Sequence, residues 1–376
     1  MRGVDNVDFD VESYADIESI RSRWLMLHAS GLSTPFQSFA WCNALLDTVG
    51  RARGAKPHFL IVVDRRTRED LLLLPLVQIK KWSISVITMP DFGLSDYNMP
   101  LISVRLAHNR ERLKQVWEAL RNYMPSADLL RFQQVPELVD GTPNPLLSIM
   151  NLREHPYSSW QLHLPEPGTS KDVGDLVLSR RQQRLVRKKL NKIASVTDVI
   201  PLTVEEKQRL FEHMLHHRRA RFQKLDRPDA LDDPAVVAFY RRMLVEPNIV
   251  VSGLAVGDTV IATIFGLADK NQFYLLMTSF DSAWAEASPG FALIYRSILA
   301  LNKQGVRVFD FTIGDESYKR RFKTIRTPIF EAASALSPLG VLMVAWLSFL
   351  PYVLVGRRSG KRLLGHASGK LKLLLR

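Results

Sequence analysis

Several features that identify common classes of protein are missing from this sequence. Its 376 residues include one cysteine, Cys42, which excludes an intramolecular disulfide and a cysteine-rich metal site. The sequence contains no Gly-x-Ser-x-Gly, Walker or Gly-x-Gly-x-x-Gly pattern, which argues against a serine hydrolase, a P-loop enzyme and a nucleotide-dependent dehydrogenase. The first residues, among them Asp5, Asp8 and Asp10, lack the basic start and apolar core of a secretory signal. We therefore expect a cytoplasmic protein.

Positive charge is the clearest feature that is present. With 51 Lys and Arg residues against 38 Asp and Glu residues, the chain carries a net charge of +13. The excess is concentrated in residues 180–192 and 357–376, and the remainder of the chain is close to neutral. A partner that needs this charge is expected beside one of these segments, as an anionic lipid, a phosphorylated substrate or a nucleic acid.

The length of the chain corresponds to about two domains, and the order of elements indicates a repeated unit. In the first half we predict helices at residues 17–27, 39–49 and 107–123 and strands at residues 59–63, 71–76, 83–89 and 129–132. In the second half we predict helices at residues 204–221, 235–245 and from 289 onward, and strands at residues 249–255, 260–267, 273–278 and 306–311. Two copies of one α/β unit, joined by residues 165–169 and a basic helix, explain this order better than one large sheet.

Residues 336–355 form a nearly continuous apolar segment of about the length that a bilayer-spanning helix requires. Gly340 and Pro351 interrupt the segment, and basic residues follow it. Three interpretations stay open: the segment lies on a membrane surface, packs on the body of the protein, or spans a bilayer. The basic residues favour adsorption to an anionic membrane surface.

The turn Ser288-Pro289-Gly290, just before a predicted helix, has the composition of an anion-binding site. Ser288 is a suitable N-cap, and Pro289 suits the first helical position because its missing N–H would have no partner there. Gly290 adds no side chain, so a phosphate has access to the free N–H groups at the positive end of the helix dipole. The alternative is a well-capped helix without a ligand.

A second polar cluster surrounds the end of the strand at residues 306–311. Asp310 lies between two aromatic residues, so its carboxylate is expected inside the sheet, either as a catalytic group or as a structural acceptor of backbone amides. Tyr318 and Lys319 offer a phenolic acid and a cation for a leaving group or a phosphate, unless they belong to a solvated basic surface.

The helix at residues 204–221 carries His213 and His217 one turn apart, which is the spacing of a zinc-binding pair. Met214 follows His213 and no third ligand is evident, so we predict no metal site. His217 is instead a candidate general base.

The basic helix at residues 179–193 has Val186, Leu190 and Ile193 at helical spacing, so one face packs while the charges point outward. The charged face would meet RNA, lipid head groups, a cofactor phosphate or only solvent. It lacks the interleaved aromatic residues on which single-stranded nucleic acid stacks.

An ordered set of short motifs extends over residues 24–323. Its members in the first half are Trp24, Pro35-Phe36-Gln37-Ser38, Trp41, Leu74-Pro75-Leu76 and Gly93-Leu94-Ser95-Asp96-Tyr97. Those in the second half are Ser179-Arg180-Arg181, His217, Arg218, Leu254 to Gly257, Phe280-Asp281, Ser288-Pro289-Gly290, Leu293, Gly305, Phe309-Asp310-Phe311, Gly314 and Tyr318-Lys319. With this set the chain resembles the acetyltransferases assigned to cellulose and other exopolysaccharide biosynthesis, a branch of the GNAT superfamily related to FemAB-type transferases.

The resemblance implies an α/β (α+β) fold of tandem GNAT-like acyltransferase domains, each with a mixed, mostly antiparallel sheet flanked by helices. We expect an N-terminal GNAT-like domain at residues 1–165 and a C-terminal GNAT acetyltransferase domain at residues 170–327. An apolar and basic helical tail is expected at residues 328–376, outside the resemblance.

The resemblance also implies acetyl-CoA as the acyl donor, without a metal. In such folds backbone amides at a helix start hold the pyrophosphate of acyl-CoA, which assigns donor binding to Ser288, Pro289, Gly290, Phe291 and Lys319. The usual Arg/Gln-x-x-Gly-x-Gly/Ala loop is absent, so an aminoacyl-tRNA donor of the FemAB type stays an alternative.

Roles for the remaining residues follow from the same comparison. Asp310 or His217 is the expected base, and Tyr318 is the expected acid that protonates the departing thiolate. The residues expected to bind the acceptor are Ser95, Asp96, Tyr97 and Arg180.

These features predict an acyl-CoA-dependent N- or O-acyltransferase that modifies a sugar or a polysaccharide precursor in exopolysaccharide or cell-envelope biosynthesis. The tail would hold this enzyme at the inner face of the cell membrane. The alternatives are a transferase that uses aminoacyl-tRNA and a non-catalytic scaffold of an exopolysaccharide assembly. Strongly salt-dependent RNA binding by the basic helix would favour the aminoacyl-tRNA alternative, and turnover of an acyl-CoA would exclude the scaffold.

Overall fold

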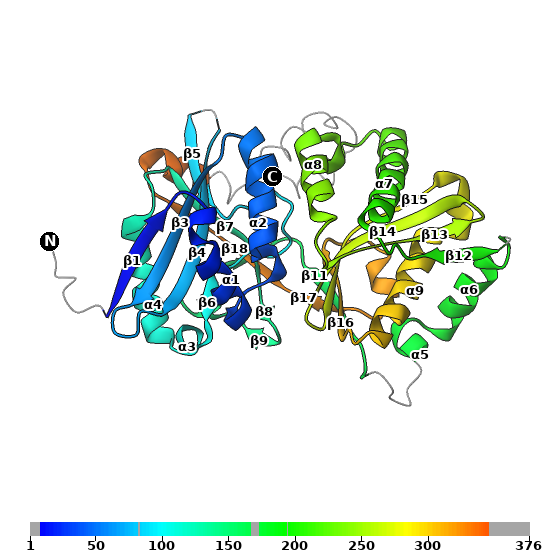
Figure 1. The fold of residues 1–376 in the computed structure, drawn as a ribbon, viewed down its shortest axis with the longest axis horizontal. Helices are drawn as coiled ribbons and strands as arrows, with labels where there is room; N and C mark the ends of the chain where they lie inside the picture. Colours follow the sequence, from blue (N-terminus) through cyan, green and yellow to red (C-terminus); the bar gives the residue numbers. More distant parts are fainter. Residues whose placement is uncertain (1–7, 82, 167–172, 194, 346–376) are drawn as a thin grey trace. The chain divides into compact units, whose positions relative to one another are not determined.

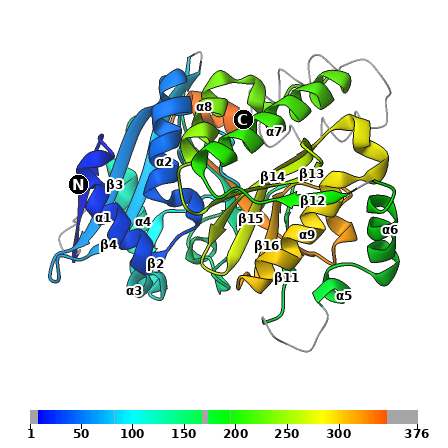
Figure 2. The same cartoon turned by 45° about the vertical axis from the view of Figure 1, so that its right-hand side comes forward.

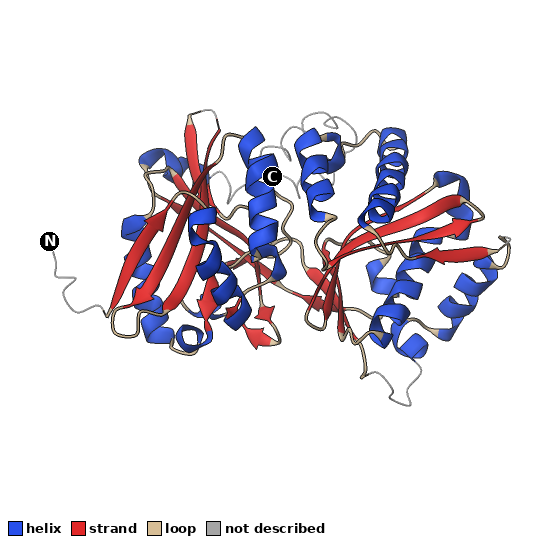
Figure 3. Cartoon of the chain, in the orientation of Figure 1, coloured by secondary structure: helices blue, strands red, loops and turns tan. Residues whose placement is uncertain are grey.

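The computed structural model describes residues 8–81, 83–166, 173–193 and 195–345, and the chain divides into two compact units (Figure 1). The first unit comprises Met1–His155 and Pro328–Arg376, and the second comprises Pro156–Thr327. In each unit, helices pack against one main β-sheet (Figure 3).

The main sheet of the first unit has the strand order β1-β3-β4-β5-β7-β18-β10. Its strands are β1 (Phe9–Tyr14), β3 (Lys56–Asp64), β4 (Asp70–Lys81), β5 (Ile84–Thr88), β7 (Leu129–Pro136), β18 (Ile329–Ala335) and β10 (Arg153–Glu154), and β6 (Leu101–Ser103) joins β2 (Gly31–Leu32) to β4. The helices are α1 (Arg21–Ser30), α2 (Phe39–Leu45), α3 (Val104–Ala107) and α4 (Arg110–Leu120), and β8 (Leu138–Val139) pairs with β9 (Thr142–Pro143). The strands pair antiparallel except β5 and β7, which are parallel.

Strand β3 shows why this sheet has a core on each face. Phe59 and Ile61 pack with Trp24 of α1, whereas Leu60 and Val62 pack in the cluster that contains the buried side chains of α4. Successive side chains of a strand point to opposite faces, so a strand that is apolar at every position is buried on both sides.

The sheet of the second unit has the order β12-β13-β14-β15-β16-β11-β17. Its strands are β12 (Val196–Val199), β13 (Ile249–Val256), β14 (Thr259–Asp269), β15 (Gln272–Phe280), β16 (Val308–Ile313), β11 (Ser159–His163) and β17 (Ile325–Thr327). The helices are α5 (Val173–Val177), α6 (Arg180–Leu190), α7 (Val204–Lys224), α8 (Pro234–Met243) and α9 (Pro289–Lys303). Helices α7 and α8 cover one face of the sheet, and α9 covers the other with α6 beside it (Figure 2).

The predicted fold class is confirmed, because each unit has a mixed, mostly antiparallel sheet flanked by helices. The two strand orders also correspond position by position. In each unit a parallel pair, β5 with β7 and β15 with β16, stands in the middle of antiparallel neighbours. The sheets therefore repeat one topology, as the repeated order of elements in the sequence indicated.

The two units exchange one strand. Strand β11 follows the first unit along the chain but lies in the sheet of the second, next to β16. Strand β18 follows the second unit but pairs with β7 and β10 in the first. The expected boundary at residue 165 is therefore wrong, since it assigns β11 to the first domain, and the expected tail at 328–376 begins with a strand of the first unit's sheet.

The apolar segment 336–355 is described only as far as residue 345. No helix in the described part of the chain has the length and apolar character needed to cross a bilayer. The rest of the segment and the basic residues 357–376 lie outside the described residues.

Candidate active site

Strands β15 and β16 of the second unit are paired over only part of their length (Figure 2). The parallel ladder joins Gln272 to Val308, Phe273 to Phe309 and Tyr274 to Asp310 and does not continue to the ends of either strand. The separated ends leave a gap in the sheet, at the C-terminal end of β15. At this gap a ligand can enter between two neighbouring strands of the sheet.

Helix α9 begins close to this gap and leaves two N–H groups free. Pro289 occupies the first helical position, and the N–H groups of Gly290 and Phe291 have no acceptor among the described residues. The positive end of the helix dipole and these N–H groups form a binding site for an anion. A Cβ on Gly290 would meet Phe280 at 3.4 Å, which is ordinary contact, so the packing of the chain does not require glycine there.

Ser288 differs from its expected role as an N-cap. Its backbone is left-handed, with φ of 55°, and its hydroxyl makes no capping hydrogen bond to α9. Instead the Nζ of Lys189 on α6 donates a hydrogen bond to the Oγ of Ser288 at 2.7 Å. Lys189 has no carboxylate partner among the described residues. The basic helix therefore places an unneutralised cation beside the free N–H groups of α9.

Asp310 has the contacts of a structural carboxylate. The side chain is completely buried. It accepts hydrogen bonds from the Thr312 backbone N–H at 2.7 Å, from Gln161 at 2.9 Å and from Gln272 at 3.2 Å. These hydrogen bonds hold Asp310 at the last paired position of the β15–β16 ladder. They fit the interpretation of Asp310 as a structural acceptor of hydrogen bonds rather than as a catalytic group.

Lys319 is also held within the protein. It is buried, and its Nζ donates to the carbonyl oxygens of Thr312 at 3.2 Å and Ile313 at 3.1 Å and pairs with Glu316 at 3.0 Å. The ammonium group thus donates hydrogen bonds to the carbonyl oxygens at the C-terminal end of β16. With its hydrogen-bonding capacity used by these three oxygens, Lys319 is poorly suited to the donor-binding role predicted for it.

His217 has the environment of a base. It is 8% exposed, and its Nδ1 is buried without a hydrogen-bond partner among the described residues. Burial lowers the pKa of His217 below 6.5, while the nearby Asp281 carboxylate opposes this shift. The imidazole is therefore neutral at pH 7 and has a lone pair available for a proton.

Arg221 connects the surroundings of His217 with Tyr318. It lies one helical turn after His217 on α7, and its guanidinium is 5.1 Å from the centre of the Phe280 ring at the end of β15. Burial raises the pKa of the Tyr318 phenol, and the Arg221 charge partly opposes this effect. Arg221 is exposed, and its spacing from His217 places both side chains on one face of α7.

Three of the four residues predicted to bind the acceptor, Ser95, Asp96 and Tyr97, belong to the first unit. Ser95 and Tyr97 are buried in the first unit, where the Ser95 Oγ accepts from the Trp41 indole at 2.9 Å and the Tyr97 carbonyl accepts from Gln37 at 2.9 Å. Asp96, between them, is partly exposed. Arg180 lies at the exposed start of α6 and pairs with Asp175.

Asp91 precedes these residues in the same loop and is a further buried acid. Its carboxylate accepts hydrogen bonds from the Gly93 N–H at 2.7 Å and from the Asn98 amide at 2.9 Å. Burial nevertheless raises the pKa of Asp91 to about 6. The loop in the first unit is thus packed into the protein by its own polar contacts.

The histidines of α7 do not form part of a larger ligand cluster in the described residues. The rings of His213 and His217 are 6.2 Å apart. No group of three or more His, Cys, Asp or Glu side chains with the spacing of a metal site occurs in residues 8–81, 83–166, 173–193 and 195–345.

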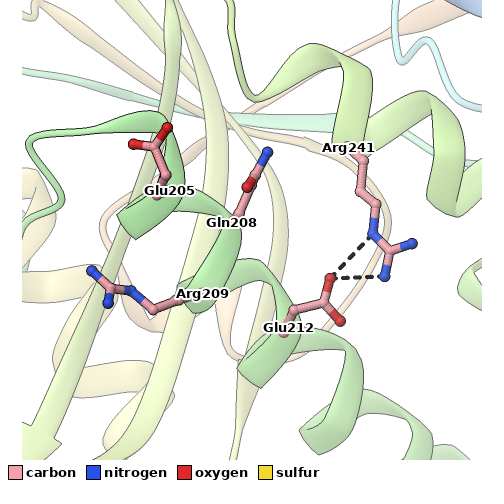
Figure 4. A pocket seen from close by; sticks show the side chains of 5 residues that line it. All are labelled: Glu205, Gln208, Arg209, Glu212 and Arg241. Carbon is pink, nitrogen blue, oxygen red and sulfur yellow. Dashed lines mark hydrogen bonds and ion pairs between the residues drawn. The ribbon is translucent and has the colours of Figure 1, made fainter.

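A cleft of about 450 Å³ lies on the first half of α7 and on α8 (Figure 4). Its lining residues, Glu205, Gln208, Arg209, Glu212 and Arg241, are all exposed. Arg241 donates to Glu212 at 3.1 and 2.8 Å across it. The charges neutralise one another, and the cleft lies on the other half of α7 from His217 and Arg221, so we assign no chemistry to it.

Residues 179–320 match the family model of the acetyltransferase (GNAT) domain. All of these residues belong to the second unit, which is therefore a GNAT acetyltransferase domain, and the class of this domain makes the chain a transferase. No curated protein is significantly similar to the chain in sequence.

Several solved structures share the fold over most of the chain. FemX has a TM-score of 0.59 and 9% identity, covering 85% of this chain and 96% of its own. The C-terminal domain assigned to a lysylphosphatidylglycerol synthetase from Agrobacterium fabrum has a TM-score of 0.51 and 11% identity, covering 89% and 97%. A conserved protein of unknown function from Bacteroides thetaiotaomicron has a TM-score of 0.50 and 12% identity, covering 86% and 99%.

Proposed function

We propose that this chain is an acyl-CoA-dependent N- or O-acyltransferase, with acetyl-CoA as its donor. The observation that carries the proposal is the gap between β15 and β16, with the free N–H groups of Gly290 and Phe291 and the Lys189 ammonium beside it. GNAT acetyltransferases use acyl-CoA, and the second unit is a domain of that family.

The residues at the start of α9 suit the phosphates of acyl-CoA. The N–H groups of Gly290 and Phe291 and the Nζ of Lys189 would hold the pyrophosphate, because donors and a positive charge converge there. When bound, acyl-CoA supplies the acyl group as a reactive thioester. The chain's own task is to orient the acceptor and to transfer its proton.

His217 is the proposed general base, and Tyr318 is the proposed acid. The Nδ1 of His217 has no competing partner in the described part of the chain, and its lowered pKa keeps it ready to accept a proton from an amine or hydroxyl. The raised pKa of Tyr318 keeps its phenol protonated, so it can donate to the departing sulfur. Asp310 keeps the structural role that its three hydrogen bonds support.

The proposed acceptor is a sugar or a polysaccharide precursor of the cell envelope. The resemblance of residues 24–323 to exopolysaccharide acetyltransferases supports this acceptor. The basic residues 357–376 support a location at the inner face of the membrane, where an anionic surface would attract them.

Calorimetric titration with acetyl-CoA tests the donor. Gly290→Glu places a carboxylate among the free N–H groups, so we expect its affinity for acetyl-CoA to fall about a hundredfold. Gly290→Ala is the matched control, because its Cβ makes only ordinary contacts and its binding should stay within a few-fold of the parent. Absence of binding by the parent protein would contradict the proposal. Release of free thiol in the presence of amino sugars and sugar nucleotides would then identify the acceptor.

A second candidate donor is aminoacyl-tRNA, and the charge of α6 favours it. Arg184, Arg187 and Lys188 are exposed and have no acidic partner among the described residues. If RNA binds here, its affinity will fall steeply with salt. Replacing Arg180, Arg184 and Lys188 by alanine would then reduce the slope of log affinity against log salt. An unchanged slope would exclude α6 as the RNA contact.

A further inference from the structure

A groove of about 380 Å³ runs between α6 and α9, beside the proposed pyrophosphate position. Its lining includes Val186, Arg187, Leu190 and Asn191 from α6 and its C-terminal end, and Tyr295 and Arg296 from α9. Tyr295 lies five positions after Gly290, which places the groove about 7.5 Å along α9 from the free N–H groups. That separation suits two parts of one elongated ligand.

Helix α6 precedes β12, the first strand in the order of the second sheet, and packs against α9. The groove between these two helices therefore lies in the same unit as the sheet gap and the free helix start. Lys189, on α6, connects the groove to that start through its hydrogen bond to Ser288.

The chemistry of the lining suits an adenine nucleotide. Val186, Leu190 and Tyr295 are partly buried against the core and form an apolar floor with one aromatic ring, on which a planar base can stack. The Asn191 amide makes no hydrogen bond with the described residues, and an asparagine amide can pair with the N6 and N7 edge of adenine.

The rim of the groove supplies both rigidity and charge. Arg296 makes a bidentate ion pair with Asp198 of β12, so this side is fixed and neutralised. Arg187 is exposed and has no ion-pair partner in the described part of the chain. One free cation beside an apolar floor matches a base that carries a phosphate.

We propose that this groove binds the adenine nucleotide of the acyl donor. The inference rests on the proposed function for the position of the donor, but its chemistry is shared by two sources. Coenzyme A ends in adenosine 3′,5′-bisphosphate, and every tRNA ends in a 3′ adenosine. In acyl-CoA the pyrophosphate and pantetheine separate the nucleotide from the thioester, so the groove holds the nucleotide and the gap between β15 and β16 receives the acyl end. In aminoacyl-tRNA the acyl group is esterified to the 3′ adenosine itself, so this donor would place its acyl group next to the groove.

Val186→Trp in the full chain fills the groove and tests the proposal by calorimetry. We expect its affinity for acetyl-CoA and for adenosine 3′,5′-bisphosphate to fall about tenfold or more, the value of one stacked base. Binding of 4′-phosphopantetheine, which lacks the adenosine, should be unchanged. Leu185→Trp is the matched control, because Leu185 is the neighbouring residue, is 51% exposed and does not line the groove.

Two surface variants keep the test valid if Val186→Trp fails to fold, as judged by circular dichroism. Asn191→Ala should weaken adenosine 3′,5′-bisphosphate more than its guanosine analogue, and Arg187→Gln should weaken both. Parent-like affinity of these variants and of folded Val186→Trp for adenosine 3′,5′-bisphosphate would overturn the inference.

Binding measurements on the parent protein distinguish acyl-CoA from tRNA as the source of the nucleotide. Binding of acetyl-CoA with the expected loss in Val186→Trp supports both the groove and the proposed function. No binding of acetyl-CoA, together with groove-dependent binding of an RNA hairpin ending in CCA, supports the groove and overturns the acyl-CoA donor. Acetyl-CoA binding that no groove variant weakens overturns the groove alone, and binding of neither probe overturns both.

Discussion

The Nζ of Lys189 lies 2.7 Å from the hydroxyl oxygen of Ser288 and so joins the basic helix α6 to the first residue before α9. A cation at the positive end of a helix dipole is unfavourable by itself, by about 0.3–1 kcal/mol. An anion between the ammonium and the free N–H groups would reverse the sign of this interaction. The contact therefore indicates a site arranged for a phosphate group.

Lys189→Ala separates the binding role of this lysine from a structural one. We expect affinity for acetyl-CoA to fall about tenfold, because a charge-assisted contact is lost, while the melting temperature stays the same or rises slightly. Lys188→Ala removes an exposed cation of the same helix and serves as the control. A large loss of thermal stability without loss of affinity would show that Lys189 only holds α6 to α9.

His217→Gln tests the proposed base through the pH profile. Since the pKa of His217 is lowered from 6.5 by burial, the acid limb of kcat/KM in the parent should lie below pH 6.5. The variant should lose about a hundredfold in kcat and lack this limb. An unchanged profile would assign the proton transfer to another group.

The same histidine affects stability with a defined sign. Its pKa is lower in the folded than in the unfolded state, so the folded protein binds fewer protons in the interval between the two values. This contribution to the free energy of unfolding is present above pH 6.5 and is lost as the pH falls through the folded-state pKa. Urea unfolding at pH 5 and 7.5 should show a smaller pH dependence for His217→Gln than for the parent.

Asp91 affects stability in the opposite direction. Its pKa rises from 3.8 to about 6 on folding, so protonation favours the folded state. Stability from this group is greatest below pH 3.8 and declines by about 3 kcal/mol as the pH rises to 6. From pH 3.8 to pH 6, the unfolding free energy of the parent should therefore decrease relative to that of Asp91→Asn. A difference that is independent of pH would show that Asp91 titrates normally.

Local patterns in the sequence were sufficient for most elements of the fold. The apolar run around β3 and the spacing of Leu113, Val116 and Leu120 in α4 place side chains on buried faces, and the structure buries them there. The exchanged strands were missed, because the partners of β11 and β18 lie more than a hundred residues away in sequence. No short-range signal specifies such a pairing.

The candidate site was predictable only in part, for the same reason. The start of α9 was predicted correctly from Pro289 and Gly290, because the conformational preferences of these residues are local. Ser288 has the composition of an N-cap, but its hydroxyl binds Lys189, which is distant in sequence. The orphaned Nδ1 of His217 and the three hydrogen bonds of Asp310 likewise depend on residues from several elements.

Because β18 belongs to the sheet of the first unit, we predict that the stability of residues 8–155 depends on residues 328–335. Strand β18 pairs with β7 along Ile329–Ala335 and with β10 through Glu331 and Phe330, and Glu331 also pairs with Arg153 at 3.0 Å. Truncation after Thr327 removes these contacts from the first unit and exposes the β7 edge. We expect its melting temperature to fall by about 10 °C or more, with rapid proteolysis of residues 8–155. Truncation after residue 345 retains β18 and should leave both properties unchanged. Equal stability of the two truncated proteins would show that the first unit folds without the exchanged strand.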